Sequence, residues 1–331
     1  MERRAGPAAL RGPGMTAPAE TLVHRVCVYA SDEEFLRTAV PFTEEGLFLG
    51  EPVLLATTPA TAELLTGALG EQADDVVHAG DACLDGRPHR AVTAFYRYWK
   101  RHSRGPGHAR VLVEPVWDGR PAAEVAAWQR VEAGVNAVLG DTRLCIVCAY
   151  DARVAGPGVL DAARRTHPSA VAGPTVRPCP EYVDPAELAG AWETGPLPPA
   201  PRGVPVLRLD GDLRALRSFT LAASRAAGLT EDRAMTFATA VSEVGSYLWA
   251  RGGEAPAVRV WHDSSTLTCE VHQPGGRLDD RFLGYRPPGR VAAPDDGIWL
   301  ARQICDRLET RSGPAGCTFR LHFPIHPAPP P

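Results

Sequence analysis

The chain has 331 residues and a formal net charge of -4 at pH 7, and its length suits two domains of ordinary size. The charge balance gives no basic surface for nucleic acid, no apolar run is long enough to cross a membrane, and the start lacks the apolar core of a signal peptide. Eight cysteines in a chain of this length do not make a disulfide scaffold, so we expect a cytoplasmic protein with reduced thiols.

Strands and helices alternate from His24 to Thr166. After a start at residues 1–20 that we expect to be disordered, the strands are predicted over HRVCVYA, EPVLLATT, residues 75–79, ARVLVEPV and RLCIVCAYD. Helices are predicted from Ser31, which with Glu34 forms a capping box, and over residues 60–69, 90–101, 122–139 and 157–166. Because some strands are apolar on both faces, the pattern predicts a three-layer α/β domain over residues 21–171.

Residues 172–205 are rich in proline and contain one short helical piece, ELAGAWE. Proline density of this kind is typical of a semi-rigid linker without a core of its own, so we place the domain boundary here. The proline-rich tail, residues 325–331, is expected to be disordered.

The C-terminal part follows a different order of elements. It predicts a strand from Val206, two helices at 212–228 and 235–253, a hairpin of strands 257–262 and 266–272, a helix from Gly297 to about Glu309, and a closing strand at 317–323. On the second helix, Glu243 and Tyr247 lie one turn apart on a polar face, opposite a stripe of small apolar residues.

Three phrases carry a resemblance for this part: SEVGSYLWARGG, CEVHQPGGRL and DDGIWLARQICDRLETRSGPAGCTFRLHF. Over residues 206–324 they resemble the GHKL (Bergerat-fold) ATPase domain, specifically the anti-sigma factor serine kinases of the RsbW and SpoIIAB type. The resemblance implies a two-layer α/β sandwich, ATP and Mg²⁺ as cofactors, a homodimer, and a sigma factor or an anti-sigma antagonist as partner.

The residues that would carry ATP chemistry depart from that family's pattern. The resemblance assigns the catalytic role to Glu243 and nucleotide binding to Gln273, Gly275, Gly276 and Gly297. Tyr247 stands at the magnesium position, where a phenol is a poor ligand, and Gln273 lacks the charge of the usual Asp. Asp295 and Asp296 put carboxylates where phosphate should bind. We therefore expect impaired ATP chemistry, and whether the chain is an enzyme stays open.

The phrases GRPHR, VEPVWDGR, AAWQRVEAGVNAVL, LCIVCAYD and ARRTHP resemble, in order and spacing, the MEDS domain, a bacterial sensory module. The resemblance covers about His24 to Pro168 and implies a RecA- or KaiC-like α/β fold with a sensing role. The first strand is followed by no Gly-rich loop and no Gly-Lys-Ser/Thr, so a working P-loop is not expected.

Several polar or aromatic residues of these phrases are candidates for a pocket that binds a small-molecule signal, because ligands of α/β sheets bind at the carboxyl ends of strands. They are Glu114, Trp117, Arg120, Glu132, Asn136, Tyr150 and Asp151, with Arg87, Arg90, His24 and His167 beside them. The alternative is an internal network in which Arg87 or Arg120 pairs with Glu114 or Glu132. Cys145 and Cys148 have metal-knuckle spacing, but they lie in one strand and face opposite sides, so we expect buried thiols and no metal.

Two functions follow from the resemblances. In the first, the chain is a sensor-coupled anti-sigma regulatory factor whose C-terminal domain binds a sigma factor or an anti-sigma antagonist. In the second, it is an active ATP-dependent serine/threonine kinase that phosphorylates the antagonist.

Overall fold

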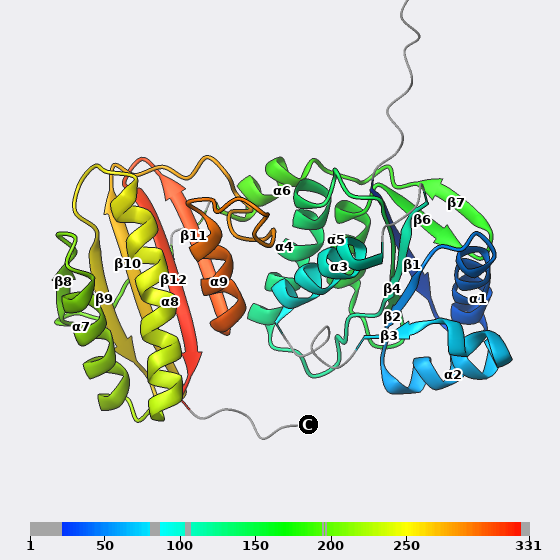
Figure 1. Cartoon of the computed structure of the whole chain (residues 1–331), viewed down its shortest axis with the longest axis horizontal. Helices are drawn as coiled ribbons and strands as arrows, with labels where there is room; N and C mark the ends of the chain where they lie inside the picture. Colours follow the sequence, from blue (N-terminus) through cyan, green and yellow to red (C-terminus); the bar gives the residue numbers. More distant parts are fainter. Residues whose placement is uncertain (1–21, 80–86, 103–106, 194, 196, 326–331) are drawn as a thin grey trace, which may run out of the picture.

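The structure, a computed structural model, describes residues 22–79, 87–102, 107–193, 195 and 197–325. It contains two sheets, each with its own helices (Figure 1). This confirms the predicted α/β architecture of two domains. The expected disordered ends lie outside the described residues, except for Ile325, which is buried. Within the described residues, no helix is both long enough and apolar enough to cross a membrane.

The N-terminal domain is built on a seven-stranded sheet of order β3-β2-β4-β5-β1-β6-β7, parallel except for the last pair. Its elements up to the fifth helix are β1 (Val23–Tyr29), α1 (Asp32–Phe48), β2 (Val53–Ala56), α2 (Pro59–Leu69), the 3-10 turn η1 (Gly70–Asp75), β3 (Val77–His78), α3 (Pro88–His102), β4 (Ala109–Val113), α4 (Ala122–Val138), β5 (Leu144–Asp151) and α5 (Pro157–Thr166). One apolar core lies on each face of the sheet, so the three-layer prediction is confirmed. The capping box also forms, because Ser31 accepts from the amide of Glu34 and the Glu34 carboxylate accepts from the amide of Ala30.

The proline-rich stretch contributes to the N-terminal domain. β6 (Ser169–Ala172) pairs with β1, and β7 (Thr175–Pro178) forms the antiparallel edge of the sheet. The short helix expected at ELAGAWE is α6 (Pro185–Trp192), which buries Leu188 and Ala189 in the core beside α4. Residues up to about 192 are therefore packed against this domain, because two fully buried apolar side chains anchor the helix in spite of the neighbouring prolines.

The C-terminal domain is an antiparallel sheet of order β11-β12-β10-β9-β8 with its apolar core against three helices. Its elements are β8 (Val206–Arg208), α7 (Leu213–Ala226), α8 (Glu231–Ala250), β9 (Ala257–His262), β10 (Thr266–Pro274), α9 (Asp296–Ile304), β11 (Arg307–Gly313) and β12 (Gly316–Pro324). The small stripe on α8 allows close packing on α7, since a Cβ at Gly245 would lie only 2.7 Å from Leu216.

Two details of this domain differ from the sequence prediction. The last helix ends at Ile304 rather than near Glu309, because Leu308 and Thr310 alternate into the core and make residues 307–313 an edge strand. Tyr247 does not lie on a solvated face. It is 8% exposed and packs edge-on against Phe319 of β12 at 6.0 Å between ring centroids.

The contact between the two domains includes residues 277–295, which lie between β10 and α9 and are called the lid below. The lid lies between α9 and α4, and α9 lies beside α3 (Figure 1). Phe282 and Tyr285 of the lid belong to the apolar core of the N-terminal domain. The contact surface is thus partly a continuation of that core.

Candidate functional site

A crevice lies at the carboxyl ends of β1, β2, β4 and β5, the place where parallel sheets bind ligands. Its volume is about 330 Å³. Three of the predicted pocket residues line it: Glu114, Trp117 and Asp151. The sequence prediction did not include four further residues that line the crevice: Asp32, Thr58, Thr61 and Arg153. They come after β1, β2 and β5, and the sequence does not show which of these strands are neighbours in the sheet.

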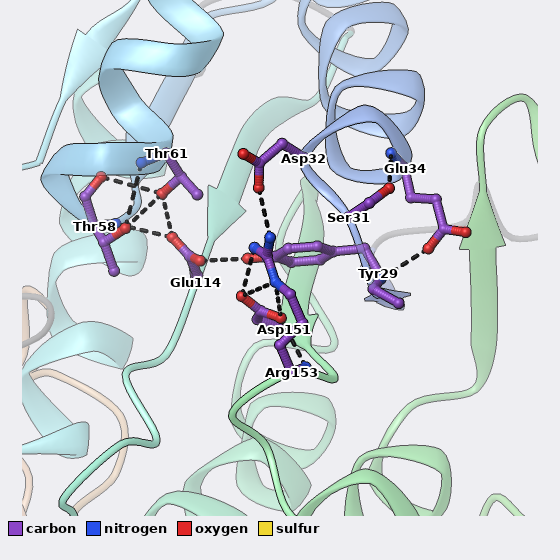
Figure 2. A network of polar contacts seen from close by, with 10 residues as sticks. Tyr29, Ser31, Asp32, Glu34, Thr58, Thr61, Glu114, Asp151 and Arg153 are labelled. Carbon is purple, nitrogen blue, oxygen red and sulfur yellow. Dashed lines mark hydrogen bonds and ion pairs between the residues drawn. The ribbon is translucent and has the colours of Figure 1, made fainter.

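Glu114 is held by three donors from two elements (Figure 2). Tyr29 donates its hydroxyl to Oε1 at 2.5 Å, the Thr58 amide donates to Oε2 at 3.0 Å, and the Thr61 hydroxyl donates to the same oxygen. Burial and the hydrogen bond to Glu114 raise the pKa of Tyr29, which keeps the phenol protonated as a donor. The carboxylate therefore fixes the start of α2 and one wall of the crevice.

Arg153 closes another wall. It donates to both oxygens of Asp151 and, at 2.8 Å, to Asp32 (Figure 2). The hydrogen bond from Arg153 lowers the pKa of Asp151, so this carboxylate is charged at neutral pH. The crevice carries the carboxylates of Asp32, Glu114, Asp118 and Asp151 against the guanidinium of Arg153. Such a surface suits a ligand that donates hydrogen bonds, such as an alcohol or an amine, and disfavours an anion.

The other predicted pocket residues have packing roles or lie elsewhere. Trp117 stacks on Tyr150 at 5.5 Å, which connects the crevice wall to the domain core. The Arg120 guanidinium lies over Trp128 and next to Glu124, and Arg87 pairs with Asp306 at 2.5 Å. The predicted pairing of these arginines with Glu114 or Glu132 is therefore wrong, because both carboxylates find other partners.

Glu132, which is buried, and Asn136, which is half-buried, belong to a second cluster on the α4 side of the sheet. The Glu132 Oε2 atom lies 3.3 Å from His24 Nε2 and 3.4 Å from His167 Nε2, and His24 Nδ1 lies 3.1 Å from Asn136 Oδ1. Cys148 contacts the same group, whereas Cys145 lies on the opposite face, as predicted for positions three apart in a strand.

In the C-terminal domain the predicted nucleotide residues lie in two places, Gly297 with Glu243 at the start of α9, and Gln273, Gly275 and Gly276 at the end of β10 and the turn after it. A Cβ at Gly297 would clash with Glu243 Oε2, so the start of the helix lies directly against this carboxylate. Gln273 is 3% exposed, and its amide donates to the carbonyls of Leu248, Gly252 and Glu254 at 2.9–3.3 Å. It thereby caps the C-terminal end of α8.

Glycines shape the turn that follows Gln273. Gly275 adopts a φ of 65°, in the left-handed region that favours glycine. A Cβ at Gly276 would lie 2.8 Å from Cys317 Sγ. The two glycines thus allow the backbone to pass close to β12, and this packing accounts for them without a bound nucleotide.

Comparison with known proteins bears on the N-terminal domain. Residues 23–168 match the family model MEDS, described as the MEthanogen/methylotroph, DcmR Sensory domain. No curated protein matches the chain. Residues 23–168 therefore form a MEDS sensory domain, which indicates that the chain is a regulatory protein of the sensor type.

Proposed function

We propose that the chain is a cytoplasmic, sensor-coupled anti-sigma regulatory factor of a bacterial partner switch. The C-terminal domain binds a sigma factor or an anti-sigma antagonist, and a small molecule at the sensory domain alters that binding. The observation that carries the coupling is the packing of the lid and α9 on α3 and α4 of the sensory domain.

The apolar side chains between the lid and α4 are tightly packed, so neither element can move without affecting the other. Phe282 and Tyr285 are 4% and 1% exposed and pack edge-on at 5.5 Å from each other. Both rings reach α4 at Gly134, where a Cβ would lie 2.9 Å from Phe282 and 3.0 Å from Tyr285. A small displacement of α4 must therefore displace the lid or open the contact.

Polar pairs surround the apolar contact. Arg286 of the lid donates to both carboxylate oxygens of Asp141 at 2.9 and 3.0 Å. Glu193, whose side chain is 6% exposed, accepts from Arg130 of α4 at 2.7 Å and from Arg281 of the lid at 2.6 Å. These pairs fix the register of the two surfaces, and a change in the sensory domain would reach the lid through them.

The C-terminal site supports a binding role with impaired ATP chemistry. The Gln273 amide is engaged with three backbone carbonyls, and Tyr247 fills the core at the position that the resemblance assigns to magnesium. ATP and Mg²⁺ are accordingly not needed for the proposed binding function. The homodimer implied by the resemblance belongs to the same proposal and is tested by light scattering.

One observation favours the kinase as a second candidate. Glu243 touches Gly297 at the start of α9, so a carboxylate stands beside a helix N-terminus, the kind of position at which phosphate binds in other proteins. In that case Glu243 is the base, and Gln273, Gly275, Gly276 and Gly297 accommodate the nucleotide.

Calorimetric titration of the full chain with ATP, with and without Mg²⁺, separates the two candidates. We expect no Mg²⁺-dependent binding, and we expect purified sigma factors or antagonists of the host to bind in a titration without nucleotide. Mg²⁺-dependent binding with a Kd of about 1 μM, close to -8 kcal/mol, followed by phosphate transfer to an antagonist that Glu243→Gln abolishes, would favour the kinase instead. Tyr247→Asn is the matched variant, since regained Mg²⁺-dependent binding would identify the phenol as the obstruction.

A further inference from the structure

Four potential metal ligands converge inside the sensory domain from four elements. His24 lies on β1, Cys148 on the neighbouring strand β5, Glu132 on α4, and His167 directly after α5. All four are buried, with exposed fractions of 3%, 2%, 4% and 0%. One ligand atom from each lies within 4.8 Å of the others, and no other such group occurs within the described ranges.

The distances match the edges of a tetrahedral site. Glu132 Oε2 lies 3.3 Å from His24 Nε2, 3.4 Å from His167 Nε2 and 3.5 Å from Cys148 Sγ, and His24 Nε2 lies 3.3 Å from Cys148 Sγ. Tetrahedral zinc, with bonds of about 2.0–2.1 Å to nitrogen or oxygen and about 2.3 Å to sulfur, places its ligand atoms about 3.3–3.6 Å apart. Four of the six edges already have this length.

Outer hydrogen bonds turn both imidazoles so that their Nε2 lone pairs point inward. His167 Nδ1 lies 2.7 Å from the carbonyl of Ala163 and must donate to it, so Nε2 is the acceptor. The Asn136 amide donates to the carbonyl of Thr166 at 2.7 Å, which leaves its oxygen to accept from His24 Nδ1. Partners of this kind are the usual second shell of metal-bound histidine.

One buried acceptor stays without a partner when these outer hydrogen bonds are made. The thiol proton of Cys148 can serve Glu132, but the Nε2 atoms of His24 and His167, which carry lone pairs when their Nδ1 atoms donate, face the same carboxylate, and His167 Nε2 has no hydrogen-bond partner. A cation at the centre removes the conflict, because it accepts electron pairs from all four atoms. With Cys148 as thiolate and Glu132 as carboxylate, a divalent ion also leaves the buried site with no net charge.

We propose that His24, Glu132, Cys148 and His167 bind one divalent metal ion, with zinc as the ion that best suits this mixed nitrogen, sulfur and oxygen set. Binding forms four metal–ligand bonds and releases the thiol proton of Cys148 to solvent. Four protein ligands leave no open position, so the ion is structural or sensory rather than catalytic. Glu132 lies two residues from Gly134, which touches the lid, so occupancy of the site bears on the domain contact.

The test uses the full chain purified without chelators. We expect about one equivalent of zinc by elemental analysis, and in protein produced in zinc-depleted medium we expect added Co²⁺ to give intense tetrahedral ligand-field bands and a sulfur-to-cobalt charge-transfer band. Cys148→Ser should remove the charge-transfer band and weaken Co²⁺ binding at least tenfold, and Asn136→Ala should weaken it about 10- to 100-fold through the second shell.

Cys145→Ser is the matched control, since this thiol is also buried in the same strand but faces the opposite core. It should keep the wild-type spectrum. Folded wild type without zinc and without a cobalt spectrum would overturn the proposal, and so would a charge-transfer band that survives in Cys148→Ser. The wild-type spectrum decides the question even if a variant fails to fold.

Discussion

Replacement of Gly134 by alanine tests the packing of the lid on α4, because the packing determines whether the free energy of unfolding rises or falls. In an unobstructed helix this change stabilises a protein by about 0.5–1 kcal/mol, because alanine loses less backbone entropy on folding. Here the new methyl group would lie 2.9 Å from Phe282 and 3.0 Å from Tyr285. Overpacking of buried rings costs about 1–3 kcal/mol. We therefore expect Gly134→Ala to destabilise the folded chain by up to about 2.5 kcal/mol, with a central value near 1.

The assay is urea unfolding followed by circular dichroism, with limited proteolysis of the lid as a second readout. Gly67→Ala in α2 is the control, because nothing lies within 4 Å of its added Cβ, and it should stabilise. In a Phe282→Ala background Gly134→Ala should lose part of its cost, because Tyr285 remains 3.0 Å from the methyl group, and the coupling between the two residues in contact should be at least about 0.5 kcal/mol. If Gly134→Ala stabilises as much as Gly67→Ala and leaves lid cleavage unchanged, the lid does not pack on α4 in solution.

Two further predictions concern the carboxylates of Glu114 and Glu309. In Glu114→Gln the new NH₂ group faces a donor, either the Tyr29 hydroxyl or the Thr58 amide, so a hydrogen bond is lost. We expect the free energy of unfolding, measured in urea, to fall by about 1–3 kcal/mol. A smaller loss than that of Tyr29→Phe would refute the three-donor arrangement. Burial alone would raise the pKa of Glu309, but the hydrogen bond from His322 and the charge of Arg307 outweigh it and lower the pKa to about 2. This lowered pKa stabilises the fold above the unfolded value of 4.5, and the contribution is lost as pH falls towards 2. Melting temperatures between pH 5 and about 2 should therefore fall less steeply for Glu309→Gln than for wild type, and parallel curves would contradict the assignment.

The order and type of most elements could be predicted from the sequence because their apolar periodicity is strong. α5 and β9 have the predicted bounds, and the capping box set the start of α1. The predictions went wrong where local pattern and tertiary packing disagree. The prolines around α6 indicated a linker, but Leu188 and Ala189 of this helix are buried in the core of the N-terminal domain. The many polar residues of β11 did not indicate a strand, although alternate side chains of this edge strand are buried.

The candidate sites could be predicted only in part. Glu114 and Asp151 were identified because they follow apolar strands, and the carboxyl ends of parallel strands meet at one edge. The second cluster could not be assembled, because His24, Cys148 and His167 are far apart in sequence and have no ligand spacing. Their meeting depends on β5 and β1 being neighbours in the sheet, an order that periodicity does not encode.

The short connection between the domains has a thermodynamic consequence. Because α6 packs on the sensory domain, only residues 193–205 separate it from β8, and part of this proline-rich segment lies along the outer face of the C-terminal sheet. A tether of this length holds the two surfaces at an effective concentration on the order of millimolar. A contact with an intrinsic Kd of only about 0.1 mM is then closed roughly nine-tenths of the time, and a signal worth about 1.4 kcal/mol changes the ratio of closed to open chains tenfold. A signal of this size would lower the closed fraction from about nine-tenths to about one-half, so a weak ligand opens the contact in part and a stronger one is needed to open it fully.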